Sequence, residues 1–264
     1  MRTISIVNLK GGVGKTVTAV NMAAILAESG KRVLVIDADA QANSTRFFGL
    51  KPTECSSLSE ILKGFGGCWY DFVYATNCDG VDMVPGSIDL IEADIASVQD
   101  GGAAGTIEDF LDAIEEDADT ARKDDNPNFI DYDFVIIDCP PSFTASSVAA
   151  IAASDDVIIP VKIDAFALDG LNELVAQIDG VKSIRPQIRI AGVLVTMWHN
   201  CPACAQGEEL LRGRAVPCFR THIRRSDKVD ESTFARVPLT EYSANCAAAV
   251  DYKRFVGEYL EGVE

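Results

Sequence analysis

The chain has 264 residues, of which 48% are hydrophobic, and its formal net charge is −17 at pH 7. This hydrophobic content excludes a disordered chain, and no apolar run reaches the roughly eighteen residues of a membrane-spanning helix. Met1 directly precedes the first apolar run and leaves no room for a signal peptide, so we expect a cytoplasmic protein whose eight cysteines are reduced.

The first predicted elements are a strand at residues 4–7, a glycine-rich loop at residues 9–16 and a helix after it. The loop reads Leu-Lys-Gly-Gly-Val-Gly-Lys-Thr, and a glycine loop in this context predicts a phosphate-binding site. Its backbone N–H groups can face one anion, and the helix start adds partial positive charge. We expect Lys15 to reach the terminal phosphates and Thr16 to bind Mg²⁺. The predicted nucleotide-binding residues are Lys10, Gly11, Gly12, Val13, Gly14, Lys15, Thr16 and Val17.

Apolar runs with helical patterns between them continue along the chain, at residues 32–36, 81–84, 134–137, 157–161 and 190–196. Continuous apolar strands that alternate with helices predict a parallel sheet covered on both faces. An acidic amphipathic helix is predicted at residues 106–121, and the polar stretch 117–128 is predicted to form a surface loop. No linker interrupts the pattern, so we predict a single α/β domain over residues 1–264 with one doubly wound, mostly parallel sheet.

Three aspartates follow predicted strands. Asp37 and Asp39 come at the end of the run Val-Leu-Val-Ile, and Asp138 ends the run Phe-Val-Ile-Ile. Ligand sites in sheets of this kind lie at the carboxyl ends of the strands. A carboxylate there can hold Mg²⁺ or orient a water molecule for attack on a phosphate. These positions, taken with the phosphate loop, predict a nucleotide-hydrolysing site.

The motifs KGGVGKT, VLVIDADAQAN and FVIIDCPP resemble those of ParA-type (Soj-like) ATPases, the DNA-partitioning proteins with a deviant Walker A loop. The segments 153–161, 167–171 and 192–197 also fit, so the resemblance covers essentially the whole chain. It implies a P-loop NTPase fold of the deviant Walker A type. Because the chain begins at the first strand, it resembles the short form, which lacks an N-terminal helix-turn-helix.

The resemblance also implies a role for each candidate residue. Lys10 would reach across an ATP-bound homodimer to the partner's phosphates, which explains a second lysine on a loop that already has Lys15. Asp39 would position the hydrolytic water, and Asp37 and Asp138 would join Thr16 at Mg²⁺. The implied catalytic residues are therefore Lys10, Lys15 and Asp39, and the implied cofactors are ATP and Mg²⁺.

The implied activity is an ATPase that is weak until a partner stimulates it. The partner would be a centromere-binding ParB-like protein, and the cargo a plasmid or chromosome. One alternative is a MinD-like ATPase that cycles on a membrane, which needs a basic amphipathic C-terminal helix. The C-terminus here ends with acidic residues, so we expect no membrane partner. A second alternative is a nucleotide-binding regulator that acts through protein contacts.

The charge distribution has two interpretations, an anionic partner for one part of the chain or a solvated mixed-charge surface with nucleotide contacts. Residues 1–180 contain 30 acidic and 11 basic side chains, whereas residues 181–264 contain 10 acidic and 12 basic ones. The resemblance implies non-specific DNA binding by the ATP dimer, and hence association with the nucleoid. One of the implied arginines falls at Arg224, but another position is Cys201. The predicted DNA-binding residues are Arg224, Arg225, Lys228 and Arg214.

Two further features remain open from the sequence. Cysteine and histidine residues gather between positions 199 and 222, namely His199, Cys201, Cys204, Cys218 and His222. The spacing of Cys201 and Cys204 is that of half a zinc site, and reduced thiols without a metal are the alternative. The segment that the resemblance places beside adenine reads Phe-Arg-Thr-His here, at residues 219–222.

Overall fold

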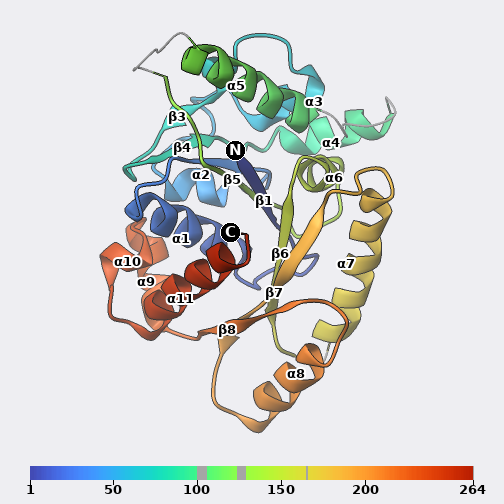
Figure 1. Ribbon diagram of the computed structural model, residues 1–264, viewed down its shortest axis with the longest axis vertical. Helices are drawn as coiled ribbons and strands as arrows, with labels where there is room; N and C mark the ends of the chain where they lie inside the picture. Colours follow the sequence, from blue (N-terminus) through green and yellow to red (C-terminus); the bar gives the residue numbers. More distant parts are fainter. Residues whose placement is uncertain (100–105, 124–128, 165, 264) are drawn as a thin grey trace.

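The computed structural model describes residues 1–99, 106–123, 129–164 and 166–263. One eight-stranded sheet runs through the molecule, and only its edge strand β3 is antiparallel to its neighbour (Figure 1). In spatial order the strands are β3 (Tyr74–Ala75), β4 (Val81–Val84), β2 (Val33–Asp37), β5 (Phe134–Asp138), β1 (Arg2–Ile6), β6 (Asp156–Lys162), β7 (Arg189–Trp198) and β8 (Cys218–Arg224). From β1 the chain passes to one side through β2, β3 and β4, returns to place β5 between β2 and β1, and continues on the other side through β6, β7 and β8, which confirms the predicted doubly wound sheet.

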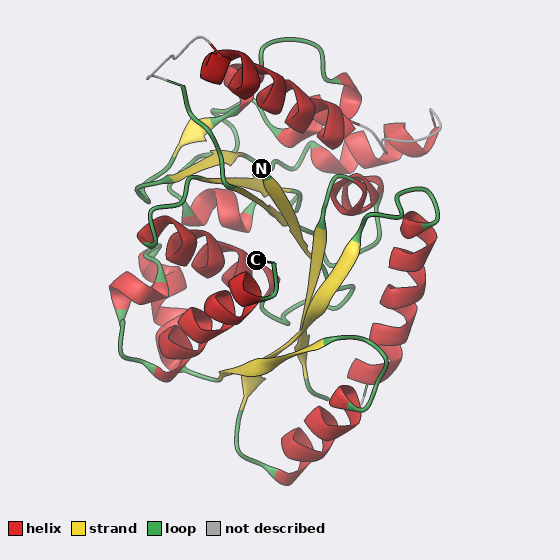
Figure 2. Ribbon diagram, viewed as in Figure 1, coloured by secondary structure: helices red, strands yellow, loops and turns green. Residues whose placement is uncertain are grey.

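Helices cover both faces of this sheet (Figure 2). Figure 1 shows α1 and α11 side by side on one face. The helices are α1 (Lys15–Glu28), α2 (Asn43–Phe47), α3 (Leu58–Gly64), α4 (Leu90–Gln99), α5 (Thr106–Lys123), α6 (Ala145–Ala152), α7 (Ala167–Lys182), α8 (Pro202–Arg212), α9 (Asp227–Ala235), α10 (Leu239–Tyr242) and α11 (Ala247–Glu261), with one 3₁₀ turn, η1 (Trp69–Phe72). Within the described residues, no helix is both long and apolar enough to cross a bilayer.

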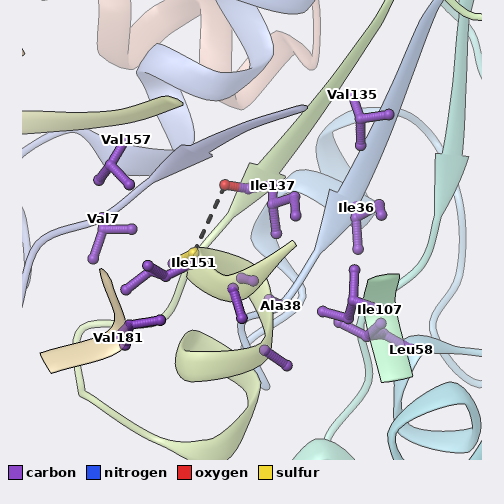
Figure 3. Close-up of a cluster of buried hydrophobic side chains, with 14 of the residues drawn as sticks. Val7, Ile36, Ala38, Leu58, Ile107, Val135, Ile137, Ile151, Val157 and Val181 are labelled. Atoms are coloured by element: carbon purple, nitrogen blue, oxygen red, sulfur yellow. Dashed lines mark hydrogen bonds between the residues drawn. The ribbon is translucent and has the colours of Figure 1, made fainter. Parts of the chain in front are cut away.

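The central strands contribute to two separate hydrophobic cores. In β2, Leu34 and Ile36 point into one core, while Val33 and Val35 point into the other. Alternate residues of a strand face opposite sides of the sheet, so a strand buried on both sides must be apolar throughout. Figure 3 shows the first core, where Ile36, Ile137 and Val157 of the sheet meet helix side chains that include Ile107 of α5 and Ile151 of α6.

The structure corrects the loop predicted at residues 117–128. Helix α5 continues to Lys123, because Ala118 and Ala121 extend its buried stripe beyond the point where the polar residues begin. Arg122 adds ion pairs to Asp119 and Asp131 near the end of the helix. The remaining part of that prediction, residues 124–128, lies outside the described residues.

A buried carboxylate joins the two ends of the chain. Asp156, at the start of β6, accepts hydrogen bonds of 2.7 Å from Arg2, Arg189 and the Tyr259 hydroxyl of α11. Burial alone would raise the pKa of Asp156, but the hydrogen bonds from Arg189, Arg2 and Tyr259 bring it below its ordinary value. This cluster fixes α11 against β1 and β6, beside the strands that carry the candidate site.

Candidate functional site

The glycine loop lies between the end of β1 and the start of α1. Gly12 (φ 70°) and Gly14 (φ 89°) both adopt left-handed backbone conformations, which a side chain would strain. Gly14 directly precedes α1, and no side chain caps that helix start. The first N–H groups of α1 therefore remain available to an anion, as the sequence motif predicts.

Neighbouring strands hold the loop in this shape. The Asn8 side chain accepts a hydrogen bond from the Lys10 N–H at 2.9 Å and donates to the Pro160 carbonyl of β6 at 2.6 Å. The Thr196 hydroxyl of β7 donates to the Val13 carbonyl at 2.7 Å. The loop is therefore fixed by two side chains, Asn8 and Thr196, and by a backbone carbonyl of β6, and the motif itself does not reveal Asn8 or Thr196.

Lys15 is buried beneath the loop and close to the predicted carboxylates. Its side chain is 7% exposed, and its ammonium group donates to the Lys10 carbonyl at 3.0 Å. Burial lowers the pKa of Lys15, while the nearby carboxylates of Asp138 and Asp39 oppose that shift. An ammonium group with a single neutral acceptor at this depth favours an anionic ligand.

Asp37 and Asp138 end adjacent strands, and they are direct register partners across β2 and β5. Both are fully buried. Asp37 accepts hydrogen bonds from the Thr45 backbone N–H at 2.8 Å and the Thr45 hydroxyl at 2.6 Å. In contrast, neither carboxylate oxygen of Asp138 has a hydrogen-bond partner within the described part of the chain.

The electrostatic environment of Asp138 indicates that this site needs a cation. Burial, together with the neighbouring charge of Asp37, raises the pKa of Asp138 to about 8, although Thr16 and Lys15 act in the opposite direction. A buried carboxylate without a hydrogen-bond donor is costly unless a cation compensates it. Carboxylate and hydroxyl oxygens are ligands that Mg²⁺ accepts. The donor set of Thr16, Asp37 and Asp138 therefore fits a magnesium ion.

Asp39 lies two residues beyond Asp37, at the edge of the site and partly exposed. One of its carboxylate oxygens accepts a hydrogen bond from the Gln41 N–H at 2.9 Å. Its own N–H donates to Asp37 at 3.2 Å, which fixes the turn after β2. Ala42, at the end of this turn, has a left-handed backbone (φ 51°). Asp39 is thus placed where a carboxylate can face both the loop and solvent.

Gly86 closes the back of this turn, and the sequence analysis did not identify it. A Cβ atom added there would lie 2.7 Å from the Asp37 carbonyl oxygen and 2.9 Å from the Asp37 carboxylate carbon. Its N–H donates to the Thr45 hydroxyl at 2.9 Å, and that hydroxyl in turn bonds Asp37. A glycine just after an apolar strand was the available signal, because β4 ends at Val84.

A cavity of about 270 Å³ opens beside the loop. Its lining includes Gly14 and Val17 from the loop and α1, Met197 and His199 after β7, and the stretch from Ile223 to Asp227. The segment 219–222, whose role at adenine the sequence left open, is absent from this lining. Phe219 packs edge-on against Phe255 at 4.9 Å, and Arg220 pairs with Glu258. Strand β8 continues to Arg224, so only its end, from Ile223 onward, reaches the cavity.

Lys10 does not project freely from the loop. Its ammonium group forms an ion pair with Asp164, which follows β6 in the same chain. The side chains of Lys10 and Asp164 are 42% and 32% exposed, so solvent screens this pair. The sequence analysis did not identify Asp164.

The predicted DNA-binding residues differ in how much freedom they have. Arg224 is held by Asp251 of α11 through two hydrogen bonds of 2.8 Å. Lys228 pairs with Glu231, and Arg214 donates to Asn172 of α7 at 3.2 Å. Arg225 is exposed, and its side chain forms no ion pair with any other described residue. The structure thus brings Arg224 and Arg225 together at the cavity, while Arg214 lies beyond α8.

The chain is similar to known proteins over nearly its full length. The family model for the AAA domain matches residues 1–190. The Caulobacter vibrioides chromosome partitioning protein ParA is 31% identical over 98% of this chain and 94% of its own. The Bacillus subtilis sporulation initiation inhibitor protein Soj is 35% identical over 95% of each chain.

Solved structures agree with these relatives. Cobyrinic acid a,c-diamide synthase from Mycobacterium smegmatis, with bound ATP analog and magnesium, superposes with a TM-score of 0.79 at 26% identity, over 99% of this chain and 95% of the other. The apo McdA structure from Cyanothece has a TM-score of 0.83 at 24% identity, over 98% and 99% of the two chains, and shares the fold. The phosphate loop, the paired strand-end aspartates and these similarities establish that the chain belongs to the ParA/Soj family of P-loop partitioning ATPases.

Proposed function

We propose that this protein is an ATP-dependent dimerisation switch for plasmid or chromosome partitioning. The observation that carries the proposal is the Asp138 carboxylate, buried without a hydrogen-bond donor beneath the phosphate loop and close to Lys15. Such a group needs a cation, and the loop above it needs an anion. Mg²⁺ with ATP satisfies both, and a relative of 26% identity was solved with bound ATP analog and magnesium.

In this proposal Thr16, Asp37 and Asp138 hold Mg²⁺, and Lys10 to Val17 surround the phosphates. Mg²⁺, when bound, neutralises charge that develops on the phosphates. Thr45 orients Asp37 through its two hydrogen bonds, so that carboxylate is preorganised. Lys15 supplies positive charge from within the protein, where burial makes its interaction with a phosphate stronger than in water.

Asp39 is the candidate for orienting the water that attacks the terminal phosphate. The Gln41 N–H holds one of its oxygens at 2.9 Å, which leaves the other oxygen to accept a hydrogen bond from water. Its position, partly exposed at the rim, allows water to enter. In contrast, Asp37 and Asp138 are fully buried and unsuited to that task.

Lys10 is proposed to serve the nucleotide of a second copy of the chain. The loop that carries Lys10 already has Lys15 for the phosphates. The Lys10 ammonium pairs with Asp164, whereas the Lys15 ammonium donates to the Lys10 carbonyl. To act across a dimer, Lys10 must exchange the Asp164 carboxylate for a phosphate of the partner. The extra negative charge of a triphosphate makes that exchange favourable, and loss of the terminal phosphate would reverse it.

DNA binding is assigned to Arg224, Arg225 and Lys228, with Arg214, beyond α8, as a further phosphate contact. Phosphate contacts of this kind are sequence-independent and additive in their dependence on salt. We expect the ATP dimer to bind DNA and to associate with the nucleoid. A ParB-like centromere-binding protein would stimulate hydrolysis and release the dimer.

The membrane-cycling alternative receives no support from the C-terminal helix. The apolar side chains of α11 are used inside the protein, where Tyr252, Phe255 and Tyr259 are buried in the second core. A helix that inserts in a lipid surface needs a free apolar face. The regulator alternative predicts nucleotide binding without turnover, and hydrolysis measurements distinguish it.

The test compares wild type with two variants in ATP hydrolysis, in dimerisation by light scattering, and in DNA retention with ATP or ADP. We expect wild type to retain DNA with ATP only, and Lys15→Ala to lose ATP binding. Asp39→Ala should bind ATP, hydrolyse it at least tenfold more slowly and accumulate as a DNA-bound dimer. Wild-type hydrolysis in Asp39→Ala would refute the water-orienting role. Failure of wild type to retain DNA with ATP at low salt would refute the partitioning function.

A further inference from the structure

A group of metal-ligating side chains lies between β7 and α8, where the ATPase mechanism uses none of them. The ligand atoms of His199, Cys201 and Cys204 all lie within 4.8 Å of one another. Of the five cysteine and histidine residues that the sequence places between positions 199 and 222, these three converge in the structure. The other two have different surroundings: His222 stacks on Trp198 and bonds Glu208.

The local backbone explains why the three side chains meet. Cys201 is the N-cap of α8, and its sulfur accepts a hydrogen bond from the Cys204 N–H at 3.3 Å. Pro202 begins the helix and so brings Cys204 back over Cys201 after one turn. The Cys204 sulfur, with the residue only 5% exposed, lies 3.6 Å from Nδ1 of His199.

We propose that His199, Cys201 and Cys204 bind a zinc ion. Two thiolates and one imidazole are the donors that Zn²⁺ prefers, and the spacing Cys-x-x-Cys is that of known zinc sites. The position at the start of α8 assists, because the Cys204 N–H donates to the Cys201 sulfur and holds it beside the other two donors. Binding converts the thiols to thiolates and releases their protons to solvent.

The fourth position of a tetrahedral ion is left to water or another donor. Glu208 lies one turn beyond Cys204 on α8, but Arg212 and His222 already bond its carboxylate, at 2.6 Å and 3.3 Å. Sites with three protein ligands and an open position can exchange that ligand. We therefore expect a zinc ion that chelators can remove.

The site is next to the nucleotide cavity, because His199 is also part of the cavity lining. A zinc ion would fix the orientation of the His199 ring and thereby one wall of that cavity. A disulfide between Cys201 and Cys204 is the competing use of the same thiols. A disulfide would leave His199 without a role, so the presence of this third ligand favours a metal site over a disulfide.

The test uses protein without a polyhistidine tag, reduced and handled without oxygen. Its zinc content is measured directly, and the metal-free protein is titrated with Co²⁺ alone, in the absence of nucleotide. We expect one ion per chain, with the visible absorption of tetrahedral cobalt and a sulfur-to-cobalt charge-transfer band. Cys204→Ser should lose both bands, and His199→Ala should weaken Co²⁺ binding at least tenfold.

Cys246→Ser is the matched control. Cys246 is also a helix N-cap whose sulfur accepts a backbone N–H, from Ala249 at 3.4 Å, but it belongs to no ligand group among the described residues. Its replacement should leave Co²⁺ binding unchanged. No tetrahedral band in reduced wild type, or a Cys201–Cys204 disulfide in protein isolated without metal, would overturn the proposal. Because no arm contains nucleotide, the result is independent of the partitioning function.

Discussion

The Lys10 ammonium forms an ion pair with the Asp164 carboxylate of the same chain, 154 residues away in sequence. The lysine proposed to act on a partner's nucleotide is therefore held by its own chain before dimerisation. The pair is half exposed, and pairs of this type contribute about 0.2–1 kcal/mol. An ion pair of this strength shifts the equilibrium between monomer and dimer but does not prevent dimerisation.

Asp164→Asn should release Lys10 and favour the ATP dimer. Since 1 kcal/mol corresponds to about a fivefold change in an equilibrium constant, we expect dimerisation to strengthen by up to about fivefold. Light scattering across a series of protein concentrations with ATP and Mg²⁺ measures this shift. The matched control is Asp169→Asn, an exposed acid on α7, which should change nothing. Weaker dimerisation in Asp164→Asn would show that Asp164 assists the assembled dimer instead.

Asp138→Asn should stabilise the metal-free protein while abolishing its response to Mg²⁺ and ATP. The variant removes a buried carboxylate that lacks a hydrogen-bond donor, and such a group costs about 1–3 kcal/mol. Thermal unfolding without ligand should therefore occur at a higher temperature than in wild type. With Mg²⁺ and ATP, wild type should gain stability and the variant should gain none. A lower melting temperature in the metal-free variant would contradict this account of the site.

Gly86→Ala should damage the site from behind. The added Cβ would lie 2.7 Å from the Asp37 carbonyl oxygen, so either the turn after β2 or β4 must move. Overpacking of this kind costs about 1–3 kcal/mol, and we expect weaker Mg²⁺-dependent ATP binding as well. Gly180→Ala is the control, and it should change the free energy of unfolding in the opposite direction. Its Cβ meets nothing within 4 Å and it lies inside α7, so urea denaturation should show a gain of about 1 kcal/mol.

Arg224→Ala and Arg225→Ala should separate stability from DNA binding. Arg224 is the partner of the buried Asp251, so its removal should lower the free energy of unfolding by about 1–3 kcal/mol. Arg225 is exposed, so Arg225→Ala should leave unfolding unchanged and reduce the salt slope of ATP-dependent DNA binding by about one. Equal salt slopes in wild type and Arg225→Ala would remove Arg225 from the DNA surface.

The parts of the fold that were predictable are those that a local pattern determines. Strands β2 and β5 are apolar up to their final aspartates because they are buried on both faces, and β4 is apolar except for Asp82. All three appear within a residue of their predicted positions. Strand β8 lies at the sheet edge and has three consecutive polar residues, at 220–222, so the sequence analysis did not predict it as a strand. Edge strands carry a weaker pattern because only part of their surface is buried.

The candidate site shows the same division. The phosphate loop and the strand-end aspartates are local motifs, and their positions after apolar strands predict that they lie at one end of the sheet. Contacts between segments that are distant in the sequence follow no local motif, so the sequence did not predict them. Examples are Asp164 beside Lys10 and Gly86 behind Asp37. The sequence could not predict that His199 converges with Cys201 and Cys204, for another reason. The spacing of Cys201 and Cys204 predicts one pair of ligands. Whether a third ligand joins them depends on the conformation of the turn after β7.

The Asp156 cluster has a consequence for synthesis of the protein on the ribosome. Arg2 emerges among the first residues, whereas Tyr259 belongs to the last turns of α11. While the C-terminal segment is still in the exit tunnel, Asp156 lacks the Tyr259 hydroxyl and the second core lacks Phe255. The part of this sheet face that α11 covers beside α1 is therefore exposed until α11 has been synthesised. Native closure of this face follows the synthesis of α11, and until then the growing polypeptide presents apolar surface that chaperones bind.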